Sequence, residues 1–243
     1  MKSVLLRLEG PLQAWGTRSR FPERDTEREP SKSGVLGVVA AALGMPRDDD
    51  ARLAALAMAR MGVRVDREGG TLVDYHTAGA GRFAGVEHRV HGTDDPVITR
   101  RAYLTDASFL VALGFEDEAL AAEVDHALGS PRWPIFLGRR ACPPSLPVRA
   151  GLVSMDPEVA LRAALWPSHA RPNENVRLVL ECARDEGEPR QDHPLSFRLH
   201  ARHFARRFVK TAWIAPDDLT LLPTDMSLTS LVALREAMRP AAP

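Results

Sequence analysis

The chain has 243 residues, enough for one large domain or two small ones, and its 44% hydrophobic and 26% charged content is typical of globular proteins. It contains no run of 18 apolar residues and only two cysteines, Cys142 and Cys182, so we expect a cytoplasmic protein with free thiols and no signal peptide or membrane span. The formal net charge is zero, which argues against a uniformly basic nucleic-acid-binding domain.

The chain begins with a predicted strand and a long predicted loop. Residues 3–8 carry the apolar content of a short strand, which ends at the turn Gly10-Pro11. Residues 13–30 are polar, rich in arginine and interrupted by prolines, so we predict a loop there. Long loops inside compact domains are often functional.

A helix is predicted directly after this loop. Its apolar residues recur at the spacing of one helical face, as Val35, Val38, Val39, Ala42 and Leu43. Ser31 and Ser33 can cap its start, and Gly44 ends it. The small residues Gly34 and Gly37 predict a close approach to another backbone.

The middle of the chain alternates strands and helices around one long excursion. The predicted elements are a helix at 50–60, strands at 62–66 and 71–77 joined by a hairpin turn at 68–70, an excursion at 78–100, a strand at 102–113, a helix at 116–128 and a strand at 133–137. With the first strand and helix, this order is βαββαβ. It predicts an α+β fold with a ferredoxin-like or RRM-like domain.

A proline-rich segment at 142–147 predicts a domain boundary. We therefore expect an RRM-like domain at 1–147 and a small, mainly-β C-terminal domain at 148–243. The second unit is predicted to hold a short helix near 156–165, a strand at 176–181, a polar loop through Asp192, a basic aromatic segment at 200–213, and a final helix and tail.

The basic residues are almost all arginine, because only three of the 32 are lysine. Many of the 29 arginines cluster in the sequence, as Arg18, Arg20, Arg24 and Arg28; Arg100 and Arg101; Arg139 and Arg140; and Arg202, Arg206 and Arg207. A guanidinium pairs with phosphate and stacks on bases, so such patches on a neutral chain are compatible with an RNA partner. A GC-rich genome would produce the same excess.

Common catalytic and metal-binding patterns are absent from the sequence. The pairs His88/His91 and His200/His203 lack a neighbouring carboxylate or cysteine set, and no phosphate loop, hydrolase elbow or zinc pattern occurs. We therefore expect no metal and no other cofactor. His76 follows Tyr75 on a predicted strand, so the two side chains point to opposite faces and cannot form one acid–base pair.

The start of the long loop alternates arginines with aromatic and hydroxyl residues. It lies beside a helix start that offers Lys32, Ser33 and free backbone amides, a combination that suits an RNA backbone. Trp15 is a candidate for stacking on a base, although a plug in the core is the alternative. Lys32 is equally compatible with a solvated surface charge.

Six segments, in this order and spacing, resemble one family. They are GPLQAWG (10–16), PSKSGVLGVVAAALG (30–44), GVRVD (62–66), DYHT (74–77), RAYLTDASFLVAL (101–113) and FLGRRACPP (136–144). The family is that of the CasD subunits, RAMP-superfamily proteins of the type I-E CRISPR Cascade complex. The resemblance is close over the first 147 residues and loose beyond them.

The resemblance implies a noncatalytic subunit that holds the 5′ handle of the crRNA and caps the filament for antiviral DNA interference. It implies an inserted thumb hairpin at about 78–100, and as partners the crRNA, the CasA large subunit, the CasC backbone and, through the complex, target DNA. Carried over by position, the RNA-contact candidates are Gln13, Trp15, Arg18, Arg20, Lys32, Ser33, His76, Arg100, Arg101, Arg139 and Arg140.

Two alternatives stay open at this point. Related subunits of type I-C systems are metal-independent repeat endoribonucleases that use a Tyr, Lys and His set, which is not evident here because Lys32 is the only mid-chain lysine before Lys210. The other alternative is a general RRM-like RNA binder outside CRISPR.

Overall fold

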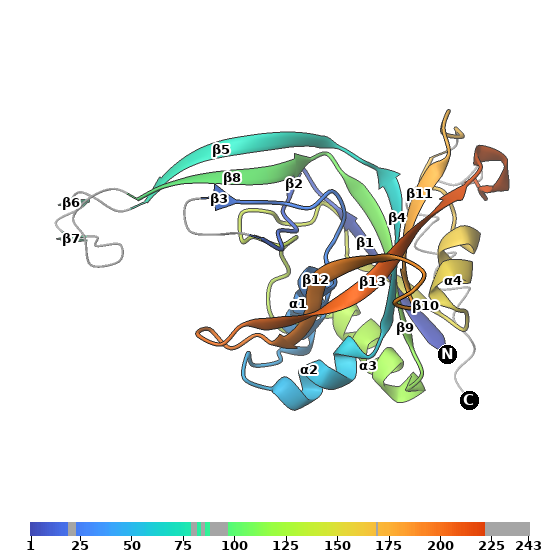
Figure 1. Cartoon of the computed structure of the whole chain (residues 1–243), viewed down its shortest axis with the longest axis horizontal. Helices are drawn as coiled ribbons and strands as arrows, with labels where there is room; N and C mark the ends of the chain where they lie inside the picture. The colour runs from blue at the N-terminus through green and yellow to red at the C-terminus, as the bar shows by residue number, and fades with distance from the viewer. Residues whose placement is uncertain (19–22, 79–81, 84–85, 88–96, 169, 222–243) are drawn as a thin grey trace.

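A computed structural model of the chain describes residues 1–18, 23–78, 82–83, 86–87, 97–168 and 170–221. Its largest element is a seven-stranded antiparallel sheet with the strand order β10-β1-β9-β4-β11-β13-β12 (Figure 1). The strands are β1 (Lys2–Glu9), β4 (Arg60–Arg67), β9 (Ser108–Phe115), β10 (Arg149–Val153), β11 (Val176–Cys182), β12 (Glu188–Ser196) and β13 (His203–Ile214).

The first four strands of this order have the ferredoxin-like arrangement. The chain runs β1, α1, β4, β9, α3, β10, and the strands lie side by side as β10-β1-β9-β4, so the predicted α+β, ferredoxin-like fold is confirmed. The helices are α1 (Lys32–Leu43), α2 (Asp50–Ala57), α3 (Glu118–Gly129) and α4 (Pro157–Ala163), followed by a 3₁₀ turn η1 (Pro216–Asp218). Within the described ranges, every helix is too short or too polar to span a lipid bilayer.

The predicted strand at 133–137 is wrong, and β10 supplies the fourth strand instead. The backbone amides of Arg132 and Trp133 donate to the carbonyl oxygens of Ala42 and Ala41 at 2.9 and 3.1 Å. The segment therefore satisfies the last carbonyl groups of α1, which have no partner inside the helix. A sheet ladder cannot use the same amides.

The predicted hairpin between 62–66 and 71–77 is also wrong. β4 pairs with β9 and β11, whereas β5 (Gly70–Ala78) pairs with β8 (Val97–Thr105) in a second sheet. The chain changes sheets at Gly69, which has φ +73° and where a Cβ would lie 2.3 Å from the carbonyl oxygen of Thr105. Glycine is the residue that tolerates both constraints.

The single strand predicted at 102–113 is divided into β8 and β9. Asp106, at φ +55°, breaks the strand, and its amide donates to the carbonyl oxygen of Pro11 at 3.2 Å. Aspartate is one of the few residues other than glycine that adopt this conformation readily. A break of this kind leaves no mark in the apolar pattern.

The β5–β8 hairpin projects away from the main sheet (Figure 1). Two short strands pair with β8 near the body, β2 (Leu12–Gln13) and β3 (Glu23–Arg24), and β6 (Arg82–Phe83) pairs with β7 (Val86–Glu87) between the two long strands. The predicted thumb hairpin at 78–100 corresponds to the far end of this hairpin. Most of its residues lie outside the described ranges.

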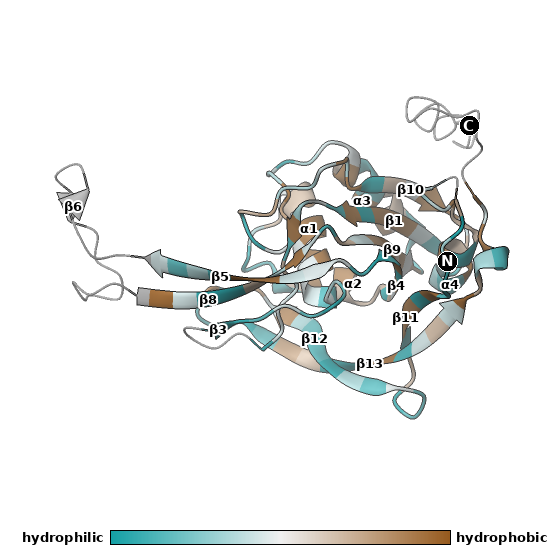
Figure 2. Ribbon diagram, turned by 90° about the horizontal axis from the view of Figure 1, so that it is seen from above, coloured by the Kyte–Doolittle hydropathy of each residue, from teal (hydrophilic) through white to brown (hydrophobic). Residues whose placement is uncertain are grey.

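Both faces of the main sheet are covered near its centre. Along β1, Val4, Leu6 and Leu8 belong to the core under α1, α2 and α3, while Leu5 belongs to the smaller core on the face of α4. β9 is buried along its whole length because both faces are covered. Figure 2 shows hydrophobic residues concentrated in α1 and the central strands, and hydrophilic ones along β12.

The sheet continues across the predicted boundary at 142–147. β10 pairs with β1, and β11 pairs with β4, although β10 and β11 both follow the boundary. The division into two domains stays a prediction. The helix near 156–165 and the strand at 176–181 correspond to α4 and β11, the loop through Asp192 is instead part of β12, and the final helix and tail lie mostly outside the described residues.

Arg64 of β4 is a buried cation that joins the sheet to the end of α4. Its side chain is 0% exposed, and Nε donates to Oδ1 of Asp66 at 2.6 Å. Nη1 donates to the carbonyl oxygens of Leu161 and Ala164 at 2.8 and 2.7 Å, and the ring of Trp166 lies 5.5 Å from the guanidinium carbon. The guanidinium therefore satisfies carbonyl groups at the C-terminal end of α4 and compensates the charge of the buried Asp66 carboxylate.

We expect the substitution Arg64→Met to lower the free energy of unfolding by about 3–5 kcal/mol, since Asp66 would keep only the more distant guanidinium of Arg7. Arg60→Met is the matched control, because the ion pair of Arg60 with Asp156 is solvent-exposed and contributes about 1 kcal/mol or less. Urea unfolding followed by circular dichroism measures both. Equal midpoints for R64M and R60M would contradict this account.

Candidate nucleic-acid interface

The start of the 13–30 loop is anchored in the core. Nε2 of Gln13 donates to the carbonyl oxygens of Leu8 and Ala107 at 3.2 and 2.8 Å, and its Oε1 accepts from Nε1 of Trp15 at 3.0 Å. Both side chains are buried. A Cβ on Gly34 would lie 2.8 Å from the Trp15 ring, so the predicted close approach to α1 is made by this ring rather than by a backbone. Trp15 is therefore a residue of the hydrophobic core, and neither Gln13 nor Trp15 is accessible for stacking on or contacting an RNA base.

The end of the loop is anchored by a buried charge network at the start of α1. Ser31 is the N-cap, and the amide of Lys32 donates to Oδ2 of Asp192 at 2.8 Å. The side chain of Lys32 is 1% exposed, and its Nζ lies 2.9 Å from Oε1 of Glu181. A carboxylate of the protein itself therefore occupies the helix start at which we expected phosphate, and Ser33 lies in the first turn instead of capping it.

Asp192 also pairs with Arg207 of β13 through two contacts, at 2.7 Å to Nε and 2.9 Å to Nη2. Burial alone would raise the pKa of this carboxyl, but the hydrogen bonds and charge of Arg207 and the Lys32 amide hold the pKa below its usual value. Burial lowers the pKa of Lys32, and the charge of Glu181 opposes that change. The lowered pKa keeps the Asp192 carboxyl ionised at neutral pH, and the network joins α1 to β11, β12 and β13.

A cleft of about 310 Å³ lies between the loop and the strands β11, β12 and β13. Its loop wall contains Thr17, Arg18, Glu27, Glu29 and Pro30, and its strand wall contains Val179, Pro189, Arg190, Gln191, Asp192, Arg206, Arg207 and Val209. The apolar side chains on both walls lie among arginines and carboxylates. The cleft is thus a mixed surface rather than a uniformly basic one.

The charges in this cleft are unevenly paired. Arg190 pairs with Glu29 at 2.9 Å and with Glu27 at 3.5 Å, and Arg207 is held by Asp192. The side chains of Arg18 and Arg206, in contrast, pair with no carboxylate among the described residues, and Arg206 makes only a 3.4 Å contact to the Gln191 amide oxygen. Arg18 on the loop wall and Arg206 on the strand wall are therefore the arginines of the cleft lining whose charge is not compensated by a carboxylate of the described residues.

A second set of predicted residues lies on β8 and beside it. The guanidinium of Arg139 stacks over the ring of Tyr103 at 4.5 Å. It donates to the carbonyl oxygens of Ala102, Arg24 and Asp25 at 3.0, 3.1 and 3.2 Å, and thereby connects β3 to β8. Its donors are directed at the backbone of the protein itself. This arginine therefore acts mainly as a structural clasp.

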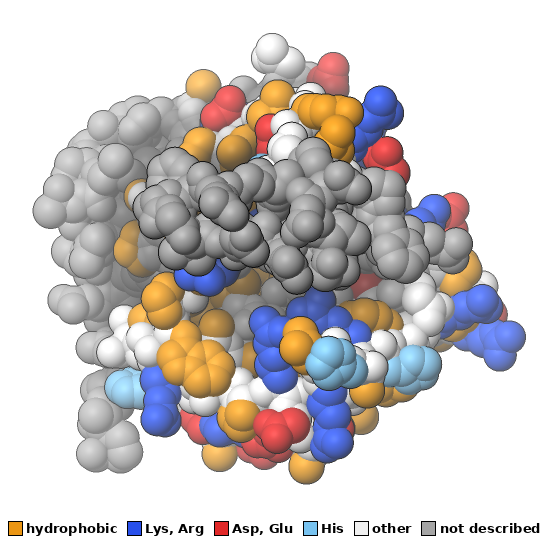
Figure 3. Space-filling view, turned by 90° about the vertical axis from the view of Figure 1, so that its left-hand side faces the viewer, with side chains coloured by type: hydrophobic (Ala, Val, Ile, Leu, Met, Phe, Trp, Pro, Cys, Tyr) orange, Lys and Arg blue, Asp and Glu red, His pale blue; other side chains and the backbone are white. Residues whose placement is uncertain are grey.

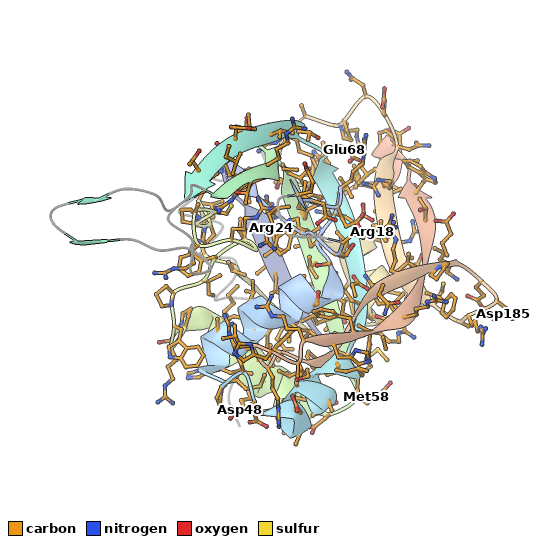
Figure 4. All side chains as sticks on the ribbon, turned by 60° about the vertical axis from the view of Figure 1, so that its left-hand side comes forward. Arg18, Arg24, Asp48, Met58, Glu68 and Asp185 are labelled. Carbon is orange, nitrogen blue, oxygen red and sulfur yellow. The ribbon has the colours of Figure 1, made fainter. Side chains whose placement is uncertain are left out.

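The remaining members of that set are more accessible. Arg100 and Arg140 are exposed, Arg101 is half-buried and donates to the Thr99 hydroxyl at 3.0 Å, and Nδ1 of His76 lies 3.9 Å from Asp74. Arg20 lies outside the described residues. Figure 4 places Arg24 under the β5–β8 hairpin and Arg18 nearer to β13, and Figure 3 shows basic and histidine side chains on the side from which the hairpin projects.

The structure therefore divides the predicted contact residues. Gln13, Trp15 and Lys32 are interior residues, Arg18 reaches the cleft, and the β8 set lies on the other side of the loop. Sequence reasoning identified the Arg206 cluster but not Arg190. No sequence signal marks Arg190, because its glutamate partners lie more than 150 positions earlier in the chain.

The chain was also compared with known proteins. A family model described as "CRISPR-associated protein (Cas_Cas5)" matches residues 3–210. The chain belongs to the Cas5 family. Among relatives, it is 39% identical over 170 residues to the CRISPR system Cascade subunit CasD of Escherichia coli (strain K12), a match that covers 65% of this chain and 75% of the relative.

Two solved structures of Cas proteins resemble the whole fold. One, described as "Crystal structure of Cas protein", has a TM-score of 0.72 and 38% identity and covers 90% of this chain and 97% of its own. The other, described as "CRISPR RNA-guided surveillance complex", has a TM-score of 0.77 and 33% identity and covers 96% and 99%. The resemblance found in the sequence motifs is confirmed.

We expect the substitution Asp192→Asn to lower the free energy of unfolding at pH 7 by about 3–5 kcal/mol, because it leaves Arg207 buried without a counter-charge. The folded pKa of Asp192 lies below its unfolded value of about 3.9, so its contribution is complete above that value and is lost as the pH falls through the folded pKa. The gap between the wild type and D192N should therefore stay constant from pH 7 to about pH 4 and narrow below that pH.

Urea unfolding at several pH values measures this gap. Glu186→Gln is the control, since Glu186 and Lys210 form an exposed pair. A D192N deficit that stays constant down to pH 3 would show that the charge is not what stabilises the network.

Proposed function

We propose that this Cas5-family chain is a noncatalytic crRNA-binding subunit of a Cascade-type surveillance complex, in which it holds the 5′ handle of the crRNA and caps the filament. The relative named as a Cascade subunit and the similar chain from an RNA-guided surveillance complex support this role. The observation that carries it is one cleft lined by two arginines, Arg18 and Arg206, whose side chains pair with no carboxylate among the described residues.

The loop is well suited to hold a phosphate chain because both of its ends are fixed. Gln13 and Trp15 anchor the start in the core, and Ser31 and Lys32 begin a helix that Asp192 ties to β12. The Thr17 hydroxyl donates to Glu27 within the loop. A preordered loop loses less conformational entropy on binding, so the contacts of Arg18 contribute more to affinity.

The described residues favour holding RNA over cutting it. A ribonuclease site of the Tyr, Lys and His type needs the three side chains around one 2′-hydroxyl. Tyr75 and His76 are neighbours on β5, so their side chains point to opposite faces of the sheet. Tyr75 pairs with Arg100 of β8, and His76 pairs with Thr99. Lys32 is buried against Glu181 and is not accessible to a substrate.

The neighbours proposed for this subunit are the CasC-type backbone and the CasA-type large subunit, with target DNA reached through the complex. The β5–β8 hairpin offers them an exposed surface with Val73, Tyr75 and Ile98 on one face. Exposed aromatic and aliphatic side chains of this kind are typical of protein interfaces.

Purified full-length protein should not cleave repeat RNA in EDTA, and the substitution His76→Ala should change nothing in that assay. Denaturing gels of end-labelled RNA measure the outcome. Specific cleavage that disappears in H76A would instead establish the endoribonuclease alternative.

We expect Arg18→Ala and Arg206→Ala each to weaken binding of RNA that carries the 5′ handle, by about 5- to 100-fold at low salt, because each removes a charge-assisted phosphate contact. The slope of log affinity against log salt should fall by about one per arginine removed.

Arg52→Ala is the matched control, since Arg52 is exposed on α2, away from the cleft, and pairs with Glu123. Fluorescence anisotropy measures all three variants. Unchanged affinity and slope in both R18A and R206A would reject the cleft as the handle site.

A further inference from the structure

Trp213, near the end of β13, is the most exposed tryptophan in the chain. It is 54% exposed, whereas Trp15 and Trp166 are buried and Trp133 is 43% exposed. An indole on an open sheet surface leaves a large apolar area in water. Among the described residues, the Trp213 indole has no hydrogen-bond partner and no cation or ring stacked on it.

The surface that carries Trp213 is continuous with the cleft. In the β11–β13 register, Glu181 lies opposite Val209, Val179 opposite Thr211 and Arg177 opposite Trp213, so these residues share one face. Val179 and Val209 line the cleft. Trp213 therefore lies four residues beyond the cleft on the same strand face, at about 13 Å.

A chain of ion pairs also connects the two places. Glu29, a residue of the cleft wall, pairs with Arg190 in the cleft at 2.9 Å and with Arg177 at 3.1 Å. Arg177 makes two further contacts with Glu68, at 2.9 and 3.1 Å. Arg177, the cross-strand neighbour of Trp213, is thus held in one orientation by Glu29 and Glu68.

The charges differ between the two ends of this surface. At the cleft end, Arg18 and Arg206 are unpaired and suit phosphate groups. At the other end, Glu29 and Glu68 compensate the charge of Arg177, which lies beside the flat indole of Trp213. An aromatic side chain on a sheet face is a platform on which single-stranded RNA bases stack.

We propose that Trp213 is a base-stacking platform for a single-stranded RNA whose backbone is held in the cleft by Arg18 and Arg206. This inference rests on the proposed function and extends it, because it assigns the path of the RNA beyond the cleft, along β13. Protein anchors also use tryptophan, but the continuity with the cleft that Arg18 and Arg206 line favours a nucleic-acid strand.

Binding of handle-containing RNA to full-length variants tests the platform. Trp213→Ala should weaken affinity by about 5- to 150-fold, the loss that corresponds to one base–aromatic stack. The salt slope should not change, since no charge is removed. Trp213→Phe should retain most of the affinity, and Trp133→Ala, at a similarly exposed tryptophan, should bind as the wild type.

Tryptophan fluorescence gives an independent readout that a merely structural role would not affect. RNA should quench the emission of the wild type and of Trp133→Phe, and this quenching should be lost in Trp213→Phe. Far-UV circular dichroism confirms that the variants are folded.

Failure of the platform and failure of the proposed function are distinguishable. If R18A and R206A weaken binding while W213A and the quenching do not change, the platform is rejected and the RNA-holding role stands. If none of the variants changes RNA affinity, both are rejected. If W213A binds RNA normally but no longer assembles with partner subunits, Trp213 is a protein anchor and the proposal is overturned.

Discussion

The carboxylate of Asp192 is the contact on which the arrangement of the interface depends. It accepts hydrogen bonds from the first amide of α1 and from the guanidinium of Arg207. These contacts join a helix of the ferredoxin-like unit to β12 and β13. Glu181 makes a parallel connection through Lys32. Together with the pairs that Arg190 makes with Glu27 and Glu29, these contacts fix the position of the loop that precedes α1 relative to β12 and β13.

This network bears on how a chain with no net charge would present the RNA-binding surface that we propose. Most cleft carboxylates are already used, since Asp192 holds Arg207, and Glu27 and Glu29 hold Arg190. Pairing those charges inside the protein leaves Arg18 and Arg206 as the local surplus. Binding then depends on where unpaired guanidinium groups lie, and the total charge carries little information about the partner.

Local patterns were enough to predict the order of the ferredoxin-like elements, because apolar periodicity, the Ser31 cap and Gly44 are all encoded within a few residues. They failed where a distant partner decides the structure. The amides of Arg132 and Trp133 donate to carbonyl groups of α1 rather than to a strand. Lys32 is buried because its ammonium pairs with Glu181, a residue 149 positions away that local patterns do not reveal. Arg18 was found by composition, whereas Arg190 required the fold.

The burial of Lys32 also bears on whether this Cas5-family chain holds or cuts the RNA that we propose it binds. A lysine at a helix start beside an RNA-binding loop is a natural candidate for acid–base chemistry, but here Glu181 holds its ammonium in the interior. The residue thus stabilises the position of the loop instead of reaching a 2′-hydroxyl. Since Tyr75 and His76 point to opposite faces of β5, these side chains do not converge on one site with Lys32, whereas Arg18, which we propose to hold RNA, lines the cleft.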